Sequence, residues 1–176
     1  NLGVTSLYAV MLHTTPPLST NNGDIYWNTL QELREQGVIQ KTGYSIYEPT
    51  ELDKYYEKYQ PDIIQSPYNI LDNRLKESGW LQKLNDESVE VHVRSIFLQG
   101  LLLMNKKQRP QYFNQWSDLW QKWDQWLQDE NITALQATLG FVMNEKMIDN
   151  IVIGVESSKQ LKEILATSKN NYKISG

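Results

Sequence analysis

The chain has 176 residues, which is enough for one domain. Its formal net charge of −4 argues against nucleic acid or an anionic membrane surface as the main partner. The chain contains no cysteine, which excludes disulfides, thiolate metal ligands and a cysteine nucleophile, and we expect a cytoplasmic protein. We also expect no signal peptide and no membrane-spanning segment, because no apolar run is long enough.

Strand and helix patterns alternate along the chain. Apolar and β-branched runs predict five strands, at residues 7–13, 41–47, 61–69, 89–97 and 148–155. Helical spacing predicts a helix after each strand, at about residues 27–37, 48–59, 73–88, 131–144 and 157–168. Expected caps are Gly37 at the end of the first helix, Asn131 at the start of the fourth, and Ser157 or Ser158 at the start of the last.

This alternation predicts parallel strands joined by right-handed crossovers. Two architectures remain open. One is an open doubly wound sheet, and the other is part of a (β/α)8 barrel. A whole barrel needs about 250 residues. Length alone therefore favours the open sheet, which five units would complete.

A tryptophan-rich segment interrupts the pattern between about residues 100 and 130. The stretch "QWSDLWQKWDQWLQ" predicts a helix with one apolar face. We interpret it as a helix that tryptophans pack onto the body of the domain. The alternative is an aromatic surface for a partner or a substrate, because four tryptophans in one short helix are a large apolar load. The predicted face comprises Trp116, Leu119, Trp120, Trp123 and Trp126 or Leu127.

No general sequence motif identifies a site. The dinucleotide fingerprint G-x-G-x-x-G, the phosphate-loop motif, H-E-x-x-H and G-x-S-x-G are all absent. His92 lies within a strand, and we interpret it as a hydrogen-bonded core residue. Polar residues instead follow the strands, and in parallel α/β folds such residues converge at the carboxyl edge of the sheet. They are His13, Ser45, Gln65, Arg94 with Ser95, and Gly154.

These segments together resemble the C-terminal five-eighths of an aldo-keto reductase. "LYAVMLH" resembles the fourth strand of that family with its histidine, and "LQELREQGVIQKTGYSIY" resembles the following helix and fifth strand. "IIQSPYNILD" is similar to the sixth strand and "EVHVRSIFLQGLL" to the seventh. "IVIGVESSKQLKEIL" is similar to the eighth strand and the helix after it. The resemblance covers nearly the whole chain, in the right order and spacing.

The resemblance implies a (β/α)8 barrel, here strands 4–8 with a Trp-rich helical insertion after strand 7, over residues 1–176. It implies hydride transfer between NADP or NAD and a small-molecule carbonyl substrate, without a metal. His13 would orient the carbonyl, and Ser45 and Gln65 would hold the nicotinamide carboxamide. Arg94 falls where many members stack an aromatic ring on the nicotinamide. Ser95 would lie near the pyrophosphate, and Gly154, Gln160 and Glu163 at the adenosine end.

The adenosine end departs from the pattern of members that prefer NADPH, which carry a lysine or arginine near Gly154 and Gln160. Glu156 and Glu163 are acidic, and a carboxylate repels a 2′-phosphate but accepts a bond from a ribose hydroxyl. We therefore expect weakened selectivity for NADP and use of NAD. Lys159 and Lys162 argue against this expectation. Ile164 stands where the family often has an asparagine, which removes an adenine contact.

The family's general acid is a tyrosine, tuned by a lysine and an aspartate from the first three βα units. No tyrosine of this chain occupies a matching position, and the chain begins with Asn1 rather than methionine. We therefore expect a reductase that lacks its N-terminal part, with no activity in this chain alone. One alternative is a non-catalytic binding or regulatory module that uses the Trp-rich segment as its partner surface. Another is a partial barrel completed by a second chain.

Overall fold

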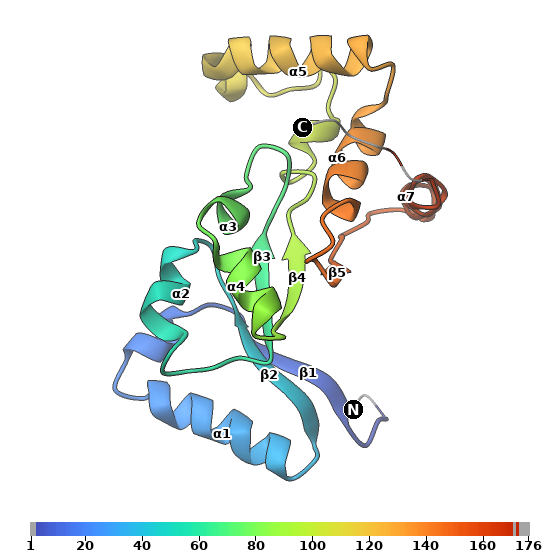
Figure 1. Cartoon of the computed structure of the whole chain (residues 1–176). Coiled ribbons are helices and arrows are strands. Elements are labelled where there is room, and N and C mark those ends of the chain that lie inside the picture. The colour runs from blue at the N-terminus through green and yellow to red at the C-terminus, as the bar shows by residue number, and fades with distance from the viewer. Residues whose placement is uncertain (1–2, 171, 173–176) are drawn as a thin grey trace. The chain divides into compact units, whose positions relative to one another are not determined.

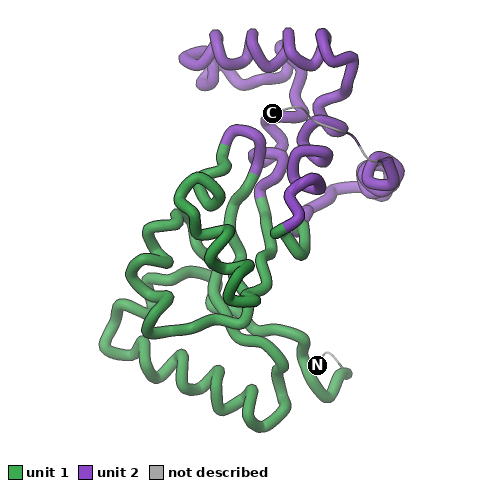
Figure 2. The backbone as a smooth tube through the Cα atoms, viewed as in Figure 1, with its two compact units in different colours: residues 1–68, 72–94, 147–151 green, residues 69–71, 95–146, 152–176 purple. Residues whose placement is uncertain are grey.

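A computed structural model describes residues 3–170 and residue 172 of the chain. The described chain divides into two compact units, shown in Figure 2. Unit 1 comprises residues up to 68, 72–94 and 147–151, and contains the sheet. Unit 2 comprises residues 69–71, 95–146 and the segment from residue 152, and contains helices alone among its regular elements.

Unit 1 is built on five parallel strands paired in chain order (Figure 1). The prediction of a parallel five-stranded sheet is therefore confirmed. The strands are β1 (Leu7–Leu12), β2 (Ile39–Ser45), β3 (Ile63–Pro67), β4 (Glu90–Arg94) and β5 (Asn150–Ile151). Its helices are the 3-10 helix η1 (Pro16–Ser19), α1 (Gly23–Glu35), α2 (Thr50–Tyr55), α3 (Arg74–Glu77) and α4 (Trp80–Asp86).

The core of unit 1 lies between one face of the sheet and the helices. In Figure 1, α1, α2 and α4 lie along this side of the strands. The two valines of β4 and the buried leucines of α4 pack here, and Trp27 of α1 sets its ring edge against Tyr44 of β2, with 6.0 Å between centroids. Buried residues of this layer include Leu30, Tyr44, Leu52, Ile64, Leu81, Leu84, Val91 and Val93.

Two aspartates fix the register at the amino ends of the strands. Asp62 directly precedes β3, and its Oδ2 accepts the backbone N–H of Thr42 in β2 at 2.9 Å. Asp149 directly precedes β5, and its Oδ2 accepts the backbone N–H of Val91 in β4 at 2.7 Å. Arg34 of α1 forms an ion pair with Asp62 at 2.7 Å. Each carboxylate thus pairs a backbone donor of the neighbouring strand that the ladder leaves open.

Several predicted boundaries in unit 1 are wrong, and in three places an element is broken or ends early. The helix expected over residues 73–88 is two helices, because Gly79 takes a left-handed conformation with φ of +82° between α3 and α4. The strand expected over 89–97 ends at Arg94, because Ser95 has a φ of +58°. The last strand, expected over 148–155, is only the two-residue β5.

Unit 2 contains the 3-10 helices η2 (Leu101–Leu103) and η3 (Gln111–Trp116), and the helices α5 (Ser117–Asp129), α6 (Ala134–Met143) and α7 (Ser158–Ser168). The cap expected at Asn131 is wrong, since α6 begins after Thr133. The Thr133 hydroxyl accepts the N–H of Gln136, whose side chain accepts the N–H of Thr133 in return. The cap expected at Ser157 is confirmed, because its hydroxyl accepts the N–H of Gln160.

The Trp-rich helix is present as α5, but only part of the predicted face is buried. Trp120 and Trp123 are 7% and 5% exposed, and pack in a cluster with Leu101, Leu102 and Ala137. Trp116 and Leu119 are exposed instead. Trp116 belongs to the 3-10 helix η3, which has a different number of residues per turn from α5. It therefore does not continue the apolar face that helical spacing predicted.

Candidate active site

The second face of the sheet carries polar side chains. Successive residues of a strand point to opposite faces, so Glu90, His92 and Arg94 of β4 share one face while its valines pack toward the helices. Lys41 and Ser45 of β2 lie on the same polar face by the same alternation. In a (β/α) barrel, one face of the sheet lines the interior and the helices cover the other face.

A side-chain contact links two strands that are not neighbours. Tyr8 of β1 donates a hydrogen bond of 2.5 Å to Oε2 of Glu90 in β4, although β2 and β3 lie between the two strands. The two long side chains thus connect β1 with β4 across the sheet.

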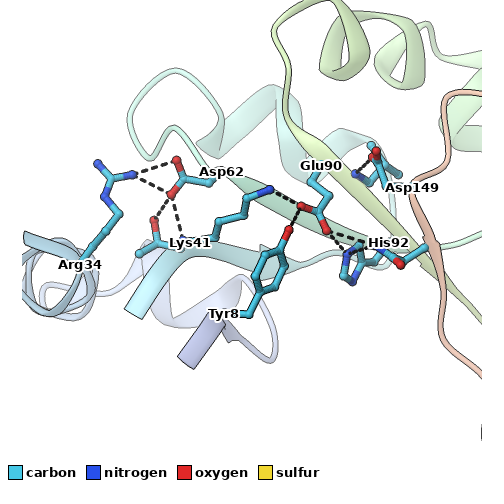
Figure 3. A network of polar contacts seen from close by, with 10 residues as sticks. Tyr8, Arg34, Lys41, Asp62, Glu90, His92 and Asp149 are labelled. Atoms are coloured by element: carbon cyan, nitrogen blue, oxygen red, sulfur yellow. Dashed lines mark hydrogen bonds and ion pairs between the residues drawn. The ribbon is translucent and has the colours of Figure 1, made fainter. Parts of the chain in front are cut away.

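Glu90 is the centre of a polar cluster that Figure 3 shows from close by. We call its five members, Tyr8, Lys41, Glu90, His92 and Asn150, the Glu90 cluster. Lys41 and Tyr8 contact Oε2 of Glu90, while His92 Nε2 lies 2.5 Å and Asn150 Nδ2 3.1 Å from Oε1. The hydrogen bonding predicted for His92 is confirmed, but the residue is half-buried on the polar face rather than part of the core.

The cluster holds its carboxylate ionised. Burial alone would raise the pKa of Glu90, but hydrogen bonds from Lys41, Tyr8 and His92 outweigh burial and lower that pKa to about 2. The same hydrogen bond to Glu90, supported by Tyr8, raises the pKa of Lys41 above its ordinary value. At neutral pH Glu90 and Lys41 therefore form an ion pair, and the cluster ties four strands together.

The carboxyl edge of the sheet brings three predicted residues side by side. Ser45 is directly paired with Gln65 in the parallel register of β2 and β3. Leu12 is paired with Tyr44, so His13 follows β1 at the level of Ser45. The side chains of His13, Ser45 and Gln65 make no hydrogen bond with any other residue among those described. His13 is exposed, Gln65 is half-buried, and Ser45 is 5% exposed.

The loop after His13 is anchored to the start of α2. Thr15 is buried, and its hydroxyl donates to the Glu51 carboxylate. The other oxygen of Glu51 accepts the backbone N–H groups of Tyr47 and Glu48, at 2.6 and 2.9 Å. One carboxylate thus joins the segments that follow β1 and β2, which fixes where His13 leaves the sheet. Sequence reasoning missed Glu51, although an acidic residue in the first turn of a helix is a recognisable signal.

Arg94 is held against the same edge. Its Nη2 donates to the backbone carbonyl of Ile46 at 3.1 Å, and its guanidinium lies 4.6 Å from the ring centroid of Tyr47. Arg94 is two residues beyond His92, the register partner of Gln65. Its backbone is paired with Pro67 of β3, and its guanidinium is stacked on Tyr47, which the sequence did not single out.

The other four predicted residues belong to unit 2. Ser95 is half-buried, whereas Gly154, Gln160 and Glu163 are exposed. Gly154 lies three residues beyond β5 rather than at a strand end. The Gln160 side-chain oxygen accepts the N–H of Glu156 at 2.8 Å, so this amide closes the first turn of α7.

The described residues contain neither a group of metal ligands nor a membrane-spanning helix. Across residues 3–170 and 172, no three histidine, aspartate or glutamate side chains gather in a way that could hold a metal ion. None of the helices described there has the length and apolar character needed to cross a membrane.

Comparisons with known proteins agree with this geometry. The family model described as the Aldo/keto reductase family matches residues 1–175. Aldo-keto reductase AKR11C1 from Bacillus halodurans is similar over 95% of this chain, with TM-scores of 0.69 for its holo form and 0.72 for its apo form, at 19% and 18% identity. The thermostable aldo-keto reductase Tm1743, solved in complex with the inhibitor epalrestat, is similar over 98% of this chain, with a TM-score of 0.69 and 18% identity. No curated protein matches.

The likeness to solved structures concerns the fold, since all identities are below 20%. The chain spans 57–58% of the length of these structures. Its five-stranded parallel sheet thus matches part of an aldo-keto reductase (β/α) barrel. With a family match over 175 of 176 residues and this fold, the chain belongs to the aldo-keto reductase family.

Proposed function

We propose that this chain supplies the carbonyl-orienting histidine and the carboxamide contacts of an NAD(P)H-dependent oxidoreductase that reduces a small-molecule carbonyl compound to an alcohol. One observation carries the proposal. His13, Ser45 and Gln65 stand side by side at the carboxyl edge of three neighbouring parallel strands, where barrel enzymes place their chemistry. Their side chains are not engaged by any other described residue, so they are available to a ligand.

The residues present fit a nicotinamide. A carboxamide has one acceptor and two donor positions, and Ser45 and Gln65 together offer a hydroxyl and an amide at adjacent register positions. Arg94, stacked on Tyr47, adds a flat surface at the same edge of the sheet. When bound, the reduced nicotinamide supplies the hydride. The chain's own part is to hold the ring in one orientation, because a misplaced donor loses most of the rate advantage of proximity.

His13 would act on the substrate carbonyl. A ring N–H of His13 that donates to the carbonyl oxygen would orient it and stabilise the negative charge that develops there. The anchoring of the following loop by Thr15 and Glu51 would limit the movement of this donor. The exposure of His13 leaves its ring accessible to substrate.

The proton donor is proposed to come from outside these residues. The resemblance to aldo-keto reductases implies that the catalytic tyrosine, lysine and aspartate belong to the first three βα units of the barrel. This chain spans 57–58% of the length of the similar structures. We propose that three such units complete the barrel and that this chain alone binds cofactor without reducing carbonyls.

Replacement of Gln65 tests the cofactor contact. We expect Gln65→Ala in the full chain to weaken NADPH binding about 10-fold, because about two amide hydrogen bonds are lost. Fluorescence titration of the nicotinamide measures this affinity. Gln40→Ala is the matched control, since Gln40 is an exposed residue of the same sheet with no role at the carboxyl edge. Equal affinities of Gln65→Ala and the unchanged chain would contradict the assignment.

The choice between NADH and NADPH is a separate prediction. Gln160 is occupied by its bond to the N–H of Glu156, and Glu163 is exposed on α7, so neither side chain offers positive charge to a 2′-phosphate. We expect the two cofactors to bind within about 10-fold of each other. Parallel titrations with NADH and NADPH measure the ratio. A preference for NADPH of about 100-fold or more would contradict this expectation.

A second candidate is a non-catalytic binding or regulatory module. The exposed aromatic side chains of η3 favour it, since Tyr112 and Trp116 are 69% and 42% exposed and their ring centroids lie 5.7 Å apart. Exposed aromatic surface of this kind marks protein contact sites. Binding of neither NADH nor NADPH would favour this candidate over the reductase.

A further inference from the structure

Tyr47 is an exposed aromatic residue at the carboxyl edge of the sheet. Within the part of unit 1 that the structure describes, three aromatic side chains are exposed, those of Tyr8, Tyr26 and Tyr47. Tyr8 lies near the start of β1, and Tyr26 belongs to α1. Only Tyr47 follows a strand, because the backbone N–H of Ile46 donates to the carbonyl of Gln65 at 2.8 Å and extends the pairing of β2 with β3 to the residue before it. Of the three rings, this one lies at the edge where barrel enzymes place their chemistry.

The ring of Tyr47 is held in place although the residue is 51% exposed. The guanidinium of Arg94 lies over the ring, 4.6 Å from its centroid. Arg94 is itself fixed, since its Nη2 donates to the backbone carbonyl of Ile46 at 3.1 Å. The backbone N–H of Tyr47 donates to Glu51 at 2.6 Å. A ligand that packs on the open part of this ring therefore costs little side-chain freedom on binding.

Glu51 shows that Tyr47 lies close to the segment that follows His13. One oxygen of the Glu51 carboxylate accepts the N–H of Tyr47, and the other accepts the hydroxyl of Thr15, two residues beyond His13. Both groups thus lie against the same side chain. Ser45, which is assigned to the carboxamide, is two residues before Tyr47. The backbone of Tyr47 is therefore close to the residues assigned to the carbonyl and to the cofactor.

The surroundings of the ring favour a flat, uncharged group. Two aromatic rings in offset or edge-to-face contact gain free energy beyond that of the apolar area they bury. Charge offers less, because two carboxylates, those of Glu48 and Glu51, follow the ring in the chain, against the one guanidinium of Arg94. A substrate that carries its own carboxylate or phosphate would meet their repulsion.

We propose that Tyr47 is a specificity-determining residue of the carbonyl site, and that it selects neutral aromatic ketones and aldehydes by stacking on the ring that bears the carbonyl group. The selection rests on the proposed function, because His13 must hold the carbonyl oxygen while Tyr47 holds the ring beside it. A single stacking contact distinguishes an aromatic ring from a saturated ring of the same size. We therefore expect a preference of about fivefold.

Two ketones with the same carbon skeleton test the selection. Acetophenone has a flat ring, and cyclohexyl methyl ketone has a saturated ring in its place. Each is titrated to about 20 mM into the ¹⁵N-labelled full chain with saturating NADP⁺, and the backbone amide shifts give the two dissociation constants. Acetophenone should bind about fivefold more tightly. Equal affinities, or binding of neither ketone, would overturn the proposal.

Replacement of Tyr47 shows whether its ring makes the difference. Tyr47→Leu should bring the ratio of the two affinities to about one, whereas Tyr47→Phe should keep it, because the ring rather than the hydroxyl is needed. Tyr26→Leu replaces the exposed tyrosine of α1 and is the matched control, which should also keep the ratio. A preference for acetophenone that survives in Tyr47→Leu would contradict the assignment.

A parallel NADPH titration of the unchanged chain separates the role of Tyr47 from the function on which it rests. If the chain binds NADPH but its choice between the ketones does not depend on Tyr47, only the role of Tyr47 is wrong. If the chain binds no NADPH, the proposed reductase itself is wrong, and the role of Tyr47 in it is wrong as well.

Discussion

Replacement of Glu90 by glutamine should lower the free energy of unfolding by about 2–4 kcal/mol. Glu90 is 9% exposed, and its two oxygens receive Tyr8, Lys41, His92 and Asn150 from four different strands or strand ends. A glutamine has one acceptor oxygen where the carboxylate has two, and it leaves Lys41 without its counter-ion. Chemical denaturation at pH 7, followed by circular dichroism, measures the change.

Glu32→Gln provides the matched comparison. Glu32 is an exposed residue of α1 whose side chain makes no hydrogen bond or ion pair with the described residues, so its replacement should change stability by less than about 0.5 kcal/mol. If the two variants are equally stable, the Glu90 cluster does not hold the strands together, and the sheet depends on its apolar face alone.

The effect of Glu90→Gln should disappear at low pH. The pKa of Glu90 is about 2 in the folded chain, below the value of about 4.3 for an unfolded glutamate. Its stabilising contribution is therefore complete above about pH 4.3 and is lost as the pH falls toward 2. The raised pKa of Lys41 acts at the other end, because its contribution is lost only as the pH rises above the ordinary lysine range. A pH series of denaturation curves checks that the original chain and the variant converge in acid but not at pH 7.

The chain order of the fold could be predicted because each strand carries its own local signal. The run of residues 7–12 has apolar side chains on both faces, and residues 89–93 are rich in β-branched side chains, so the strands form wherever the neighbours lie. Because strands alternate with helices, the sequence also predicts that the strands pair in parallel. Length alone favoured an open sheet, and the resemblance, not the composition, identified the barrel.

The wrong boundaries have local causes that compete with periodicity. Gly79 interrupts a continuous apolar pattern, because the left-handed turn it adopts stops α3 and starts α4. The cap of α6 is Thr133 rather than Asn131, because Thr133 and Gln136 form a reciprocal pair of hydrogen bonds. Both signals were present in the sequence, as a glycine within a helix and a T-x-x-Q spacing.

The candidate site was predictable in part. The polar residues after the strands could be placed at one edge because parallel strands end together. Glu90 could also have been noticed, since Glu90, His92 and Arg94 alternate with valines in one strand. Its bond with Tyr8 could not, because Tyr8 lies in β1, three strands away from β4 in the sheet.

Gly43 is a position at which an added β-carbon should affect both the fold and the candidate site. It is paired with Ile63 across β2 and β3, and a β-carbon on Gly43 would lie 1.8 Å from the backbone oxygen of Ile63. The neighbouring backbone cannot yield to such a contact without breaking the ladder. We therefore expect Gly43→Ala to lower the free energy of unfolding by about 4 kcal/mol or more, measured by urea denaturation.

The same change should disturb cofactor binding, because the pairing of Ser45 with Gln65 lies two residues along this ladder. Gly154→Ala is the control for the loss of a glycine without a steric clash. A β-carbon on Gly154 would meet nothing within 4 Å, so the free energy of unfolding should change by less than about 0.5 kcal/mol. Should Gly43→Ala fold with the stability of Gly154→Ala, the close approach of β2 and β3 would be wrong. Should it fold more weakly but bind NADPH unchanged, Ser45 and Gln65 would not be the carboxamide contacts, because their alignment cannot survive a displaced β2.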